Sequence, residues 1–522
     1  MSAFTPATAQ SGPPASAGAG DDPLAYAGVA ELAARMQDGR LSSAALAQAC
    51  LARIEAIDRQ GPQLRSVIEL NPQAMELAEA LDAERRAGRV RGPLHGIPVL
   101  LKDNIATADR MQTTAGSLAL VGARAPRDAH LVRRLRDAGA LVLGKTNLSE
   151  WANIRSTRST SGWSARGGLT RNPHALDRNT SGSSSGSGAA VAAGLAPLAV
   201  GTETDGSIVS PASVCGVVGF KPTVGLVSRD GIVPISPSQD TAGPMTRSVA
   251  DAALLLAAMA GPDPRDTATR RARGSTSLAS GAADLQAADA LRGTRLGVVR
   301  AAFTGNDRLD PVFEQALAAL AAQGAVLVED VKLPPSERYA EAELTVLLVE
   351  LKASLNAYLA EFGVGSPVRT LADVIAFNEA HAELEMPHFS QELLVRAQAM
   401  GGLRSRAYLD ALATIRRGAR TEGIDAAMRH HHLGALVAPT GGAAWLSDFV
   451  AGDHFGASFS TPAAVAGYPH LTVPCGFAAG LPLGLSFVGP AWSDARILRM
   501  GWAFEQATKA WRPPSWKSAT GA

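Results

Sequence analysis

Lys102 is the first residue of this sequence whose position suggests chemistry. It follows the apolar run Ile97–Leu101 and precedes Asp103 and Asn104. A lysine at the end of a buried strand is partly removed from water, and burial disfavours the ammonium form, so we expect its pKa to fall. A neutral lysine can accept a proton near neutral pH. Lys102 is therefore a candidate general base, with an ion pair to Asp103 or another carboxylate as the alternative.

Two segments rich in serine and glycine could supply a nucleophile. The first, residues 180–188, contains Gly182-Ser183-Ser184-Ser185-Gly186, and the second runs from Thr202 to Ile208. The first matches the GxSxG string of hydrolases that use a serine, a histidine and an acid. That string normally follows an apolar strand, whereas Arg178-Asn179-Thr180 precedes it here. A hydrolase that uses Ser184 with a histidine and an acid is one hypothesis.

Other motifs do not indicate a nucleotide, a metal or a cofactor. Gly139–Thr146 fits the P-loop string, but its middle four residues, Ala-Leu-Val-Leu, read as a strand and not as a phosphate-binding loop. The consecutive side chains of His430–His432 point three ways and do not suit one metal. Cys50, Cys215 and Cys475 are far apart and form no CxxC pair. We expect neither a metal site nor a cofactor.

Several motifs together resemble those of the amidase signature family. Ser183 and Ser207 lie 24 residues apart, which is the spacing between the two serines of that family. The likeness covers nearly the whole chain, from about Leu24 to Gln506, and within the family it is strongest to the bacterial peptide amidases. The residues that carry it are Gly96-Ile97-Pro98 with Lys102-Asp103-Asn104, Gly182–Gly186, Gly201–Ser207, Gly216–Pro222, Asp240–Pro244 with Arg247, and Ala466–Pro469 with Val473-Pro474 and Gly480–Pro482; residues 145–153 and 161–168 add the peptide amidase likeness.

The resemblance implies a Ser–Ser–Lys triad. Ser207 would be the nucleophile, Ser183 the bridging serine with a cis peptide bond before it, and Lys102 the terminal base. The N–H groups of Thr204, Asp205, Gly206 and Ser207 would hold the oxyanion, and one such donor is typically worth about 3–4 kcal/mol. Ser185 and Thr202 would support this network. Many members carry Gly-Gly-Ser at the nucleophile where this chain has Asp205-Gly206-Ser207. Because the donors to the oxyanion are main-chain N–H groups, a side chain at position 205 does not remove them.

The function implied is hydrolysis of the C-terminal amide of a small peptide to a carboxylate and ammonia, through an acyl-enzyme and without an obligatory protein partner. The alternatives are a general aliphatic or aryl amidase and a partner-dependent amidotransferase subunit. For a peptide amidase we expect a channel that is nearly closed beyond the scissile bond. Trp151, Asn153 and Trp163 are candidates for shaping it, and core packing of these residues is the alternative.

The elements that must position these residues alternate along the chain. Short apolar runs predict buried strands at 97–101, 140–143, 296–299, 325–331 and 436–438, and helical spacing predicts helices over most of 23–88, at 129–138 and at 311–323. A long helical region is expected from Ser336 to His432, with breaks at 363–367, Pro387 and Gly401-Gly402. Alternation of this kind indicates an α/β fold. The resemblance implies one large domain, residues 23–522, around a twisted, mixed and mostly parallel sheet flanked by helices.

Composition limits the remaining choices. The chain has 522 residues, 46% hydrophobic and 19% charged, with a formal net charge of +1. A nearly neutral chain offers no attraction to nucleic acid or to an anionic membrane surface. Residues 1–22 are rich in Ala, Pro, Ser and Gly and are expected to form a disordered tail, and residues 262–292 a polar surface excursion. Residues 1–22 as they stand are no signal peptide, which favours the cytoplasm, with the cell envelope as the alternative if they belong to a processed precursor.

Overall fold

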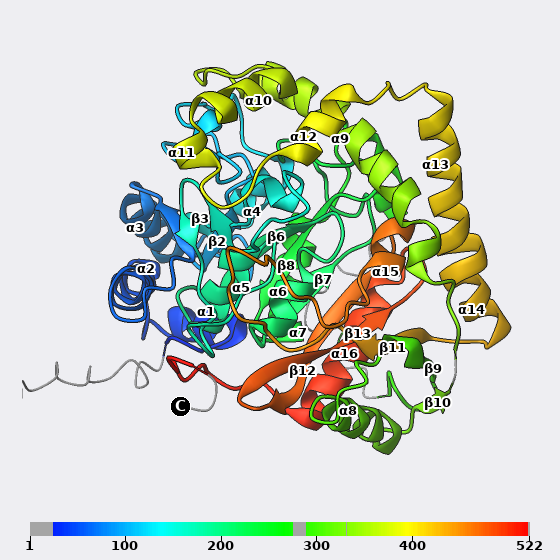
Figure 1. Cartoon of the computed structure of the whole chain (residues 1–522). Helices are drawn as coiled ribbons and strands as arrows, with labels where there is room; N and C mark the ends of the chain where they lie inside the picture. The colour runs from blue at the N-terminus through cyan, green and yellow to red at the C-terminus, as the bar shows by residue number, and fades with distance from the viewer. Residues whose placement is uncertain (1–23, 275–284, 286–288, 330, 520–522) are drawn as a thin grey trace, which may run out of the picture.

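Eleven strands form one sheet through the centre of the molecule (Figure 1). The computed structural model describes residues 24–274, 285, 289–329 and 331–519. In spatial order the strands are β1 (Val67–Leu70), β3 (Leu141–Thr146), β2 (Pro98–Lys102), β6 (Leu198–Glu203), β8 (Thr241–Thr246), β7 (Val218–Lys221), β12 (His470–Ala478), β13 (Leu481–Val488), β11 (Ala435–Pro439), β9 (Arg295–Val298) and β10 (Val326–Val328). A separate pair, β4 (Trp163–Ser164) and β5 (Gly168–Leu169), lies outside this sheet.

The sheet is mixed. Parallel pairs join β3, β2 and β6 in one part of it and β11, β9 and β10 in another, and helices connect successive strands within these groups. The other neighbouring strands pair antiparallel, including β12 and β13, which a short turn links directly. The predicted α/β domain around a mixed sheet flanked by helices is confirmed, and the predicted parallel pairing is found in these two groups.

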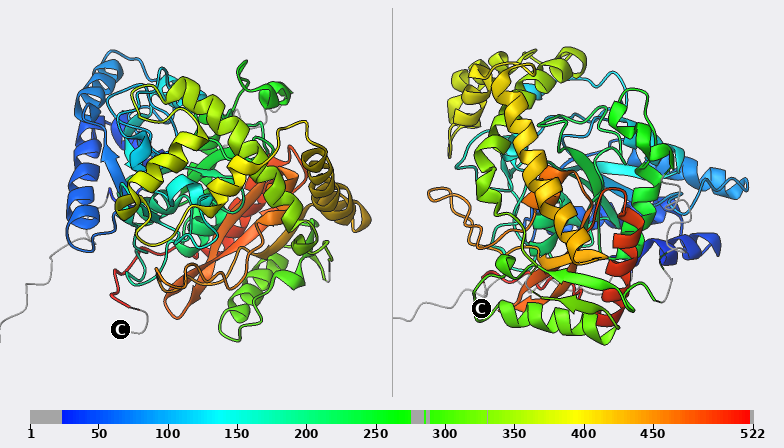
Figure 2. Two further views of the ribbon diagram at one scale, coloured as in Figure 1. Left: turned by 45° about the horizontal axis from the view of Figure 1, so that its top comes forward. Right: turned by 90° about the vertical axis from the view of Figure 1, so that its right-hand side faces the viewer.

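Helices flank the sheet and form a group above it in Figure 1, where α9 to α12 lie together. Figure 2 shows the same group from two further sides. The helices are α1 (Val29–Gln37), α2 (Ser43–Arg53), α3 (Ala74–Arg86), α4 (His130–Asp137), α5 (Ser185–Ala192), α6 (Val209–Val214), α7 (Val249–Met259), α8 (Asp310–Ala322), α9 (Ala340–Phe362), α10 (Leu371–Ala380), α11 (Ala382–Glu385), α12 (Glu392–Ala399), α13 (Arg406–Arg416), α14 (Asp425–His430), α15 (Thr461–Ala466) and α16 (Asp494–Thr508). None of the described helices is long and apolar enough to span a membrane.

Most elements lie where the sequence predicts them. The five predicted strands correspond to β2, β3, β9, β10 and β11, and the breaks in the long helical region separate α9 to α13. One prediction is wrong: residues 67–70, inside a segment expected to be helical, form the edge strand β1. This strand pairs with β3, whose residues lie more than seventy positions later in the chain, so local periodicity carries no sign of it.

The expected tail at residues 1–22 and much of the expected excursion lie outside the described residues. The described start of the excursion is attached to the domain. Ser228 Oγ donates to Asp263 Oδ2 at 2.6 Å, and Arg229 Nε donates to Asp266 Oδ2 at 2.7 Å.

The strands β3, β2 and β6 determine where the functional side chains lie. Every residue of these strands is buried, which accounts for their apolar runs. Because they are parallel, their carboxyl ends meet at one edge, and this places Lys102 beside the end of β6. Helix α5 packs on all three strands, and its small residues permit a close approach. A Cβ at Gly186 would lie 2.3 Å from the carbonyl oxygen of Ser66.

Candidate active site

Lys102 and Ser183 meet at the carboxyl edge of the sheet. Lys102 Nζ is hydrogen-bonded to Ser183 Oγ at 2.7 Å. It also donates to Thr202 Oγ1 at 2.9 Å and to the carbonyl oxygen of Thr202 at 3.1 Å. Asn104 Nδ2 donates to the same Thr202 hydroxyl at 2.9 Å. Thr202 therefore connects the predicted lysine to Asn104, a residue to which the sequence assigns no role.

Lys102 has the electrostatic character of a base. Its side chain is fully buried, and this burial lowers its pKa to about 7, against the opposing influence of Glu203 and Asp240. No carboxylate forms an ion pair with it among the described residues, and Asp103 pairs with Arg166 instead. A large fraction of Lys102 is therefore neutral at physiological pH.

Ser183 lies immediately before α5, in the first Ser/Gly segment. The peptide bond between Gly182 and Ser183 is cis, as the resemblance implies. The Ser183 carbonyl accepts a hydrogen bond from Ser149 N at 3.1 Å. Ser185 Oγ donates to the Ser181 carbonyl at 2.6 Å, so it holds the start of the helix and does not bond to Lys102 or Ser183.

Ser184 is placed differently from a hydrolase nucleophile. Its side chain is fully buried. Its hydroxyl donates to the Thr202 carbonyl at 3.0 Å and accepts from Thr202 N at 3.2 Å. Both interactions attach α5 to β6, and both engage the Ser184 hydroxyl with the main chain of Thr202. The geometry therefore does not support a hydrolase that uses Ser184 as its nucleophile.

Ser207 lies in the turn between β6 and α6. Glu203 Oε2 accepts hydrogen bonds from Ile208 N at 2.8 Å and Val209 N at 3.1 Å, so the carboxylate at the end of the strand holds the first N–H groups of the helix. The Ser207 carbonyl accepts from Ser184 N at 3.1 Å, which brings the two Ser/Gly segments together. Ser207 is 8% exposed, and its hydroxyl is not bonded to that of Ser183 among the described residues. Such contacts often tighten only when substrate binds.

The geometry of this turn presents backbone donors. Gly206 has φ 77°, and a Cβ at this position would lie 2.9 Å from Ser460 Oγ, so the turn requires glycine here. Within the described chain, the N–H groups of Asp205, Gly206 and Ser207 donate no hydrogen bond. Unused N–H groups beside a serine are the arrangement that an oxyanion requires.

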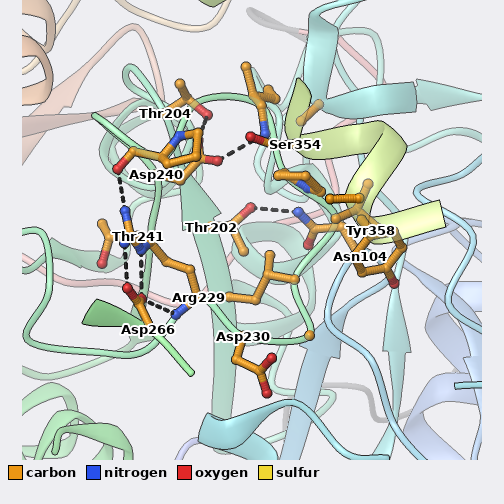
Figure 3. A pocket seen from close by; sticks show the side chains of 18 of the residues that line it. Asn104, Thr202, Thr204, Arg229, Asp230, Asp240, Thr241, Asp266, Ser354 and Tyr358 are labelled. Carbon is orange, nitrogen blue, oxygen red and sulfur yellow. Dashed lines mark hydrogen bonds and ion pairs between the residues drawn. The ribbon is translucent and has the colours of Figure 1, made fainter. Parts of the chain in front are cut away.

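A cavity of about 320 Å³ is lined by Thr202, which bonds to Lys102, and by Asn104. Figure 3 shows Asn104 and Thr202 joined by their hydrogen bond in its wall, with Asp240, Arg229 and Asp266 to one side. Ser183 and Ser207 do not line it, and a much smaller cavity of about 20 Å³ lies next to Ser181 and Ser210. The larger cavity therefore reaches the network at Thr202, and the smaller one lies beside residues that flank the two serines.

The aromatic residues predicted to shape a channel have mixed positions. Trp163 is buried, and its ring meets those of His388 and Phe389 edge to face. Trp163 therefore packs on the segment that precedes α12, where His388 is exposed and Phe389 is buried. Trp151 is also buried but lines a cavity of about 10 Å³ together with Asn104. Asn153 Nδ2 donates to Ser161 Oγ at 3.0 Å.

The remaining motifs behave as structural elements. The middle of the P-loop string lies in β3 and its lysine, Lys145, is fully buried, with Nζ donating to Thr113 Oγ1 at 3.0 Å. No group of three or more potential ligands could hold a metal ion in the part of the chain that the structure describes.

Sequence reasoning missed several buried polar residues around the site. Glu203 and Gln239 organise the turn, and Lys145 and Lys221 are fully buried, each with its pKa lowered by burial to about 8. One signal was available for the lysines. The chain has only seven lysines among 49 basic residues, and arginine carries most of its surface charge, so each lysine in an apolar segment is unusual.

The chain that carries this site is similar to known proteins over nearly its whole length. The family model described as Amidase matches residues 45–498. A probable amidase of Arabidopsis thaliana is 41% identical over 497 residues, which cover 93% of this chain and 91% of the relative. A glutamyl-tRNA(Gln) amidotransferase subunit from Symbiobacterium thermophilum is 38% identical, with 90% of this chain and 94% of the relative covered.

Solved structures give a similar result. The peptide amidase PAM in complex with the competitive inhibitor chymostatin is 56% identical, with a TM-score of 0.92, and 95% of this chain and 100% of that chain are covered. The native peptide amidase of Stenotrophomonas maltophilia is likewise 56% identical, with a TM-score of 0.90 and coverage of 95% and 99%.

Proposed function

The chain belongs to the amidase family and is an amidase, and we propose that it hydrolyses the C-terminal amide of small peptides, releasing ammonia and a peptide carboxylate. The single observation that supports a mechanism most strongly is the 2.7 Å hydrogen bond between Ser183 and the fully buried Lys102. The similarity to peptide amidases supports the choice of substrate.

In the proposed mechanism, Ser207 attacks the amide carbonyl. Ser183 accepts the proton of Ser207 and passes its own proton to neutral Lys102, so that no histidine is required. The N–H groups of Asp205, Gly206 and Ser207, with that of Thr204, stabilise the negative charge that develops on the carbonyl oxygen. The network returns the proton to the leaving nitrogen, and ammonia departs from an acyl-enzyme on Ser207. Water then hydrolyses the acyl-enzyme by the same proton route. Thr202 and Asn104 hold the lysine in place.

Selectivity for a terminal amide must come from the shape of the site, because terminal and internal amides have the same intrinsic chemistry. We propose that space beyond the scissile bond admits ammonia but not a further residue. A peptide amide, its N-methylamide and the same peptide extended by one residue test this. Rates should fall steeply along the series. Cleavage of the extended peptide at a rate close to that of the amide would instead indicate a general amidase or peptidase.

The same assay distinguishes a partner-dependent function. The similarity to amidotransferase subunits makes this the second candidate. Ammonia release from peptide amides by the purified chain alone supports an independent amidase. If ammonia is released only from glutamine, and only after a second protein is added, the amidotransferase function is indicated.

A further inference from the structure

Asp205, at which this chain departs from the Gly-Gly-Ser pattern, meets a second carboxyl group. Glu343 near the start of α9 is 8% exposed. Asp205 is half-buried, its Oδ1 is buried and has no hydrogen-bond partner among the described residues, and the two carboxyls interact electrostatically. Two ionised carboxylates in contact at a buried site repel each other, so such pairs retain one proton between them. We propose that Asp205 and Glu343 form a carboxyl pair that shares one proton and thereby positions the turn that carries Ser207.

The turn is held on both sides of Asp205, by hydrogen bonds from Gln239 on one side and by close packing on the other. Gln239 is fully buried, and its Nε2 donates to Glu343 Oε1 at 2.9 Å and to the carbonyl oxygen of Thr204 at 3.3 Å. On the other side, Gly206 packs so closely on Ser460 that a Cβ would lie 2.9 Å from its hydroxyl. A movement of Asp205 relative to α9 or α15 therefore displaces the N–H groups proposed to hold the oxyanion.

The surroundings determine which carboxyl carries the proton. Burial raises the pKa of Asp205, and the hydroxyls of Ser460 and Thr461 at the start of α15 and the cation of Lys221 at the end of β7 oppose this shift. Burial, and to a smaller extent the negative charge of Asp205, raise the pKa of Glu343 to about 8. Glu343 is therefore the proton carrier and donates to an ionised Asp205.

The other titratable groups that face the pair do not remove this proton at neutral pH. Burial and the two carboxyls raise the pKa of Tyr339, so its phenol stays neutral. The pKa of Glu203, on β6, is raised by burial, with Asp205 as a further contribution, and Glu203 bonds to the α6 side of the turn. When the pH exceeds that at which Glu343 ionises, two adjacent negative charges repel and the turn loses its position. Activity then falls on the alkaline side.

The test replaces the titrating group with one that cannot titrate. Glu343→Gln retains the shape and can still donate a hydrogen bond to Asp205, whereas Glu343→Leu cannot. The control is Glu341→Gln, on the exposed side of the same helix. The parent and Glu341→Gln should lose kcat with a midpoint near pH 8, and in Glu343→Gln that loss should move upward by about one pH unit or more. Glu343→Leu should be impaired at every pH. An unchanged alkaline limb in Glu343→Gln would overturn the proposal.

The inference rests on the proposed role of Ser207, so a second measurement separates the two. The infrared difference spectrum between the parent and Glu343→Gln requires no substrate. A protonated-carboxyl band should be present at neutral pH and should disappear at alkaline pH. If the band is present but Ser207→Ala remains active, the proposed function fails and the shared proton stands. If Ser207→Ala is inactive and the band is absent at neutral pH, the carboxyl pair is refuted while the proposed function stands.

Discussion

Lys102 Nζ lies 2.7 Å from Ser183 Oγ, and no carboxylate pairs with this fully buried lysine within the described residues. The usual role of a buried lysine is to neutralise an acid, and here its neighbours are two hydroxyls and a carbonyl. A neutral amine can donate to the two Thr202 oxygens and still accept a proton from the Ser183 hydroxyl. The relationship therefore favours proton transfer over charge pairing.

Activity should fall on acidification as Lys102 becomes protonated. Burial lowers its pKa to about 7, so the neutral fraction decreases as the pH falls through that value. Well below it, kcat/KM should drop about tenfold per pH unit, as for one titrating group. The measurement is kcat/KM for a peptide amide from weakly acidic to neutral pH. A rate that stays constant across this range would contradict the assignment of Lys102.

Lys102→Met should remove activity without removing the fold. The loss should be about 10⁴-fold or more, because Ser183 then has no acceptor for its proton. The free energy of unfolding should be unchanged or higher, since an apolar chain replaces a buried amine. Lys145→Met is the matched control: this lysine is equally buried but bonds to Thr113 and not to Ser183, so its loss should leave the activity of the folded protein nearly unchanged. Similar activity losses in both variants would argue for a structural role of Lys102.

Substitutions of Ser207 and Ser184 distinguish the roles of the two serine segments. Ser207→Ala should abolish activity, whereas Ser184→Ala should lower the free energy of unfolding by about 1–2 kcal/mol through its lost bonds to Thr202. Chemical denaturation and ammonia release measure the two effects. The opposite pattern, with an inactive Ser184→Ala and an active Ser207→Ala, would restore the hypothesis that uses a histidine.

Gly206→Ala tests the turn itself. The positive φ and the 2.9 Å approach to Ser460 Oγ predict strain of about 1–3 kcal/mol, expressed mainly as lower kcat because the turn must shift. Adding Ser460→Gly removes the steric contact but not the unfavourable φ, so it should restore only part of kcat. Full activity of Gly206→Ala would show that the turn need not be fixed.

The positions of these residues differ in how far the sequence could predict them. Lys102 was accessible because its strand is a continuous apolar run, and Ser183 and Ser207 were accessible because a motif carries them. The edge strand β1 was not, since only its pairing with β3 distinguishes residues 67–70 from a helical segment. Glu343 and Gln239 were equally hidden: each lies more than thirty residues from Asp205, and only the packing of α9 against the turn gives them a role. Trp163 shows the converse, because this aromatic residue of the likeness region packs on His388 and Phe389 and lines neither the cavity at Thr202 nor that at Ser181.

An acyl-enzyme on Ser207, formed by the chain alone, can be detected by intact-protein mass spectrometry. The purified chain is mixed with an excess of a peptide amide, quenched in acid at early times, and its mass and the ammonia released are measured together. We expect a mass increase equal to the peptide acyl group, one ammonia released per modified chain, and a modified peptide that contains Ser207. Ammonia release by the parent with no adduct at any quench time, or an adduct on Ser184, would contradict it.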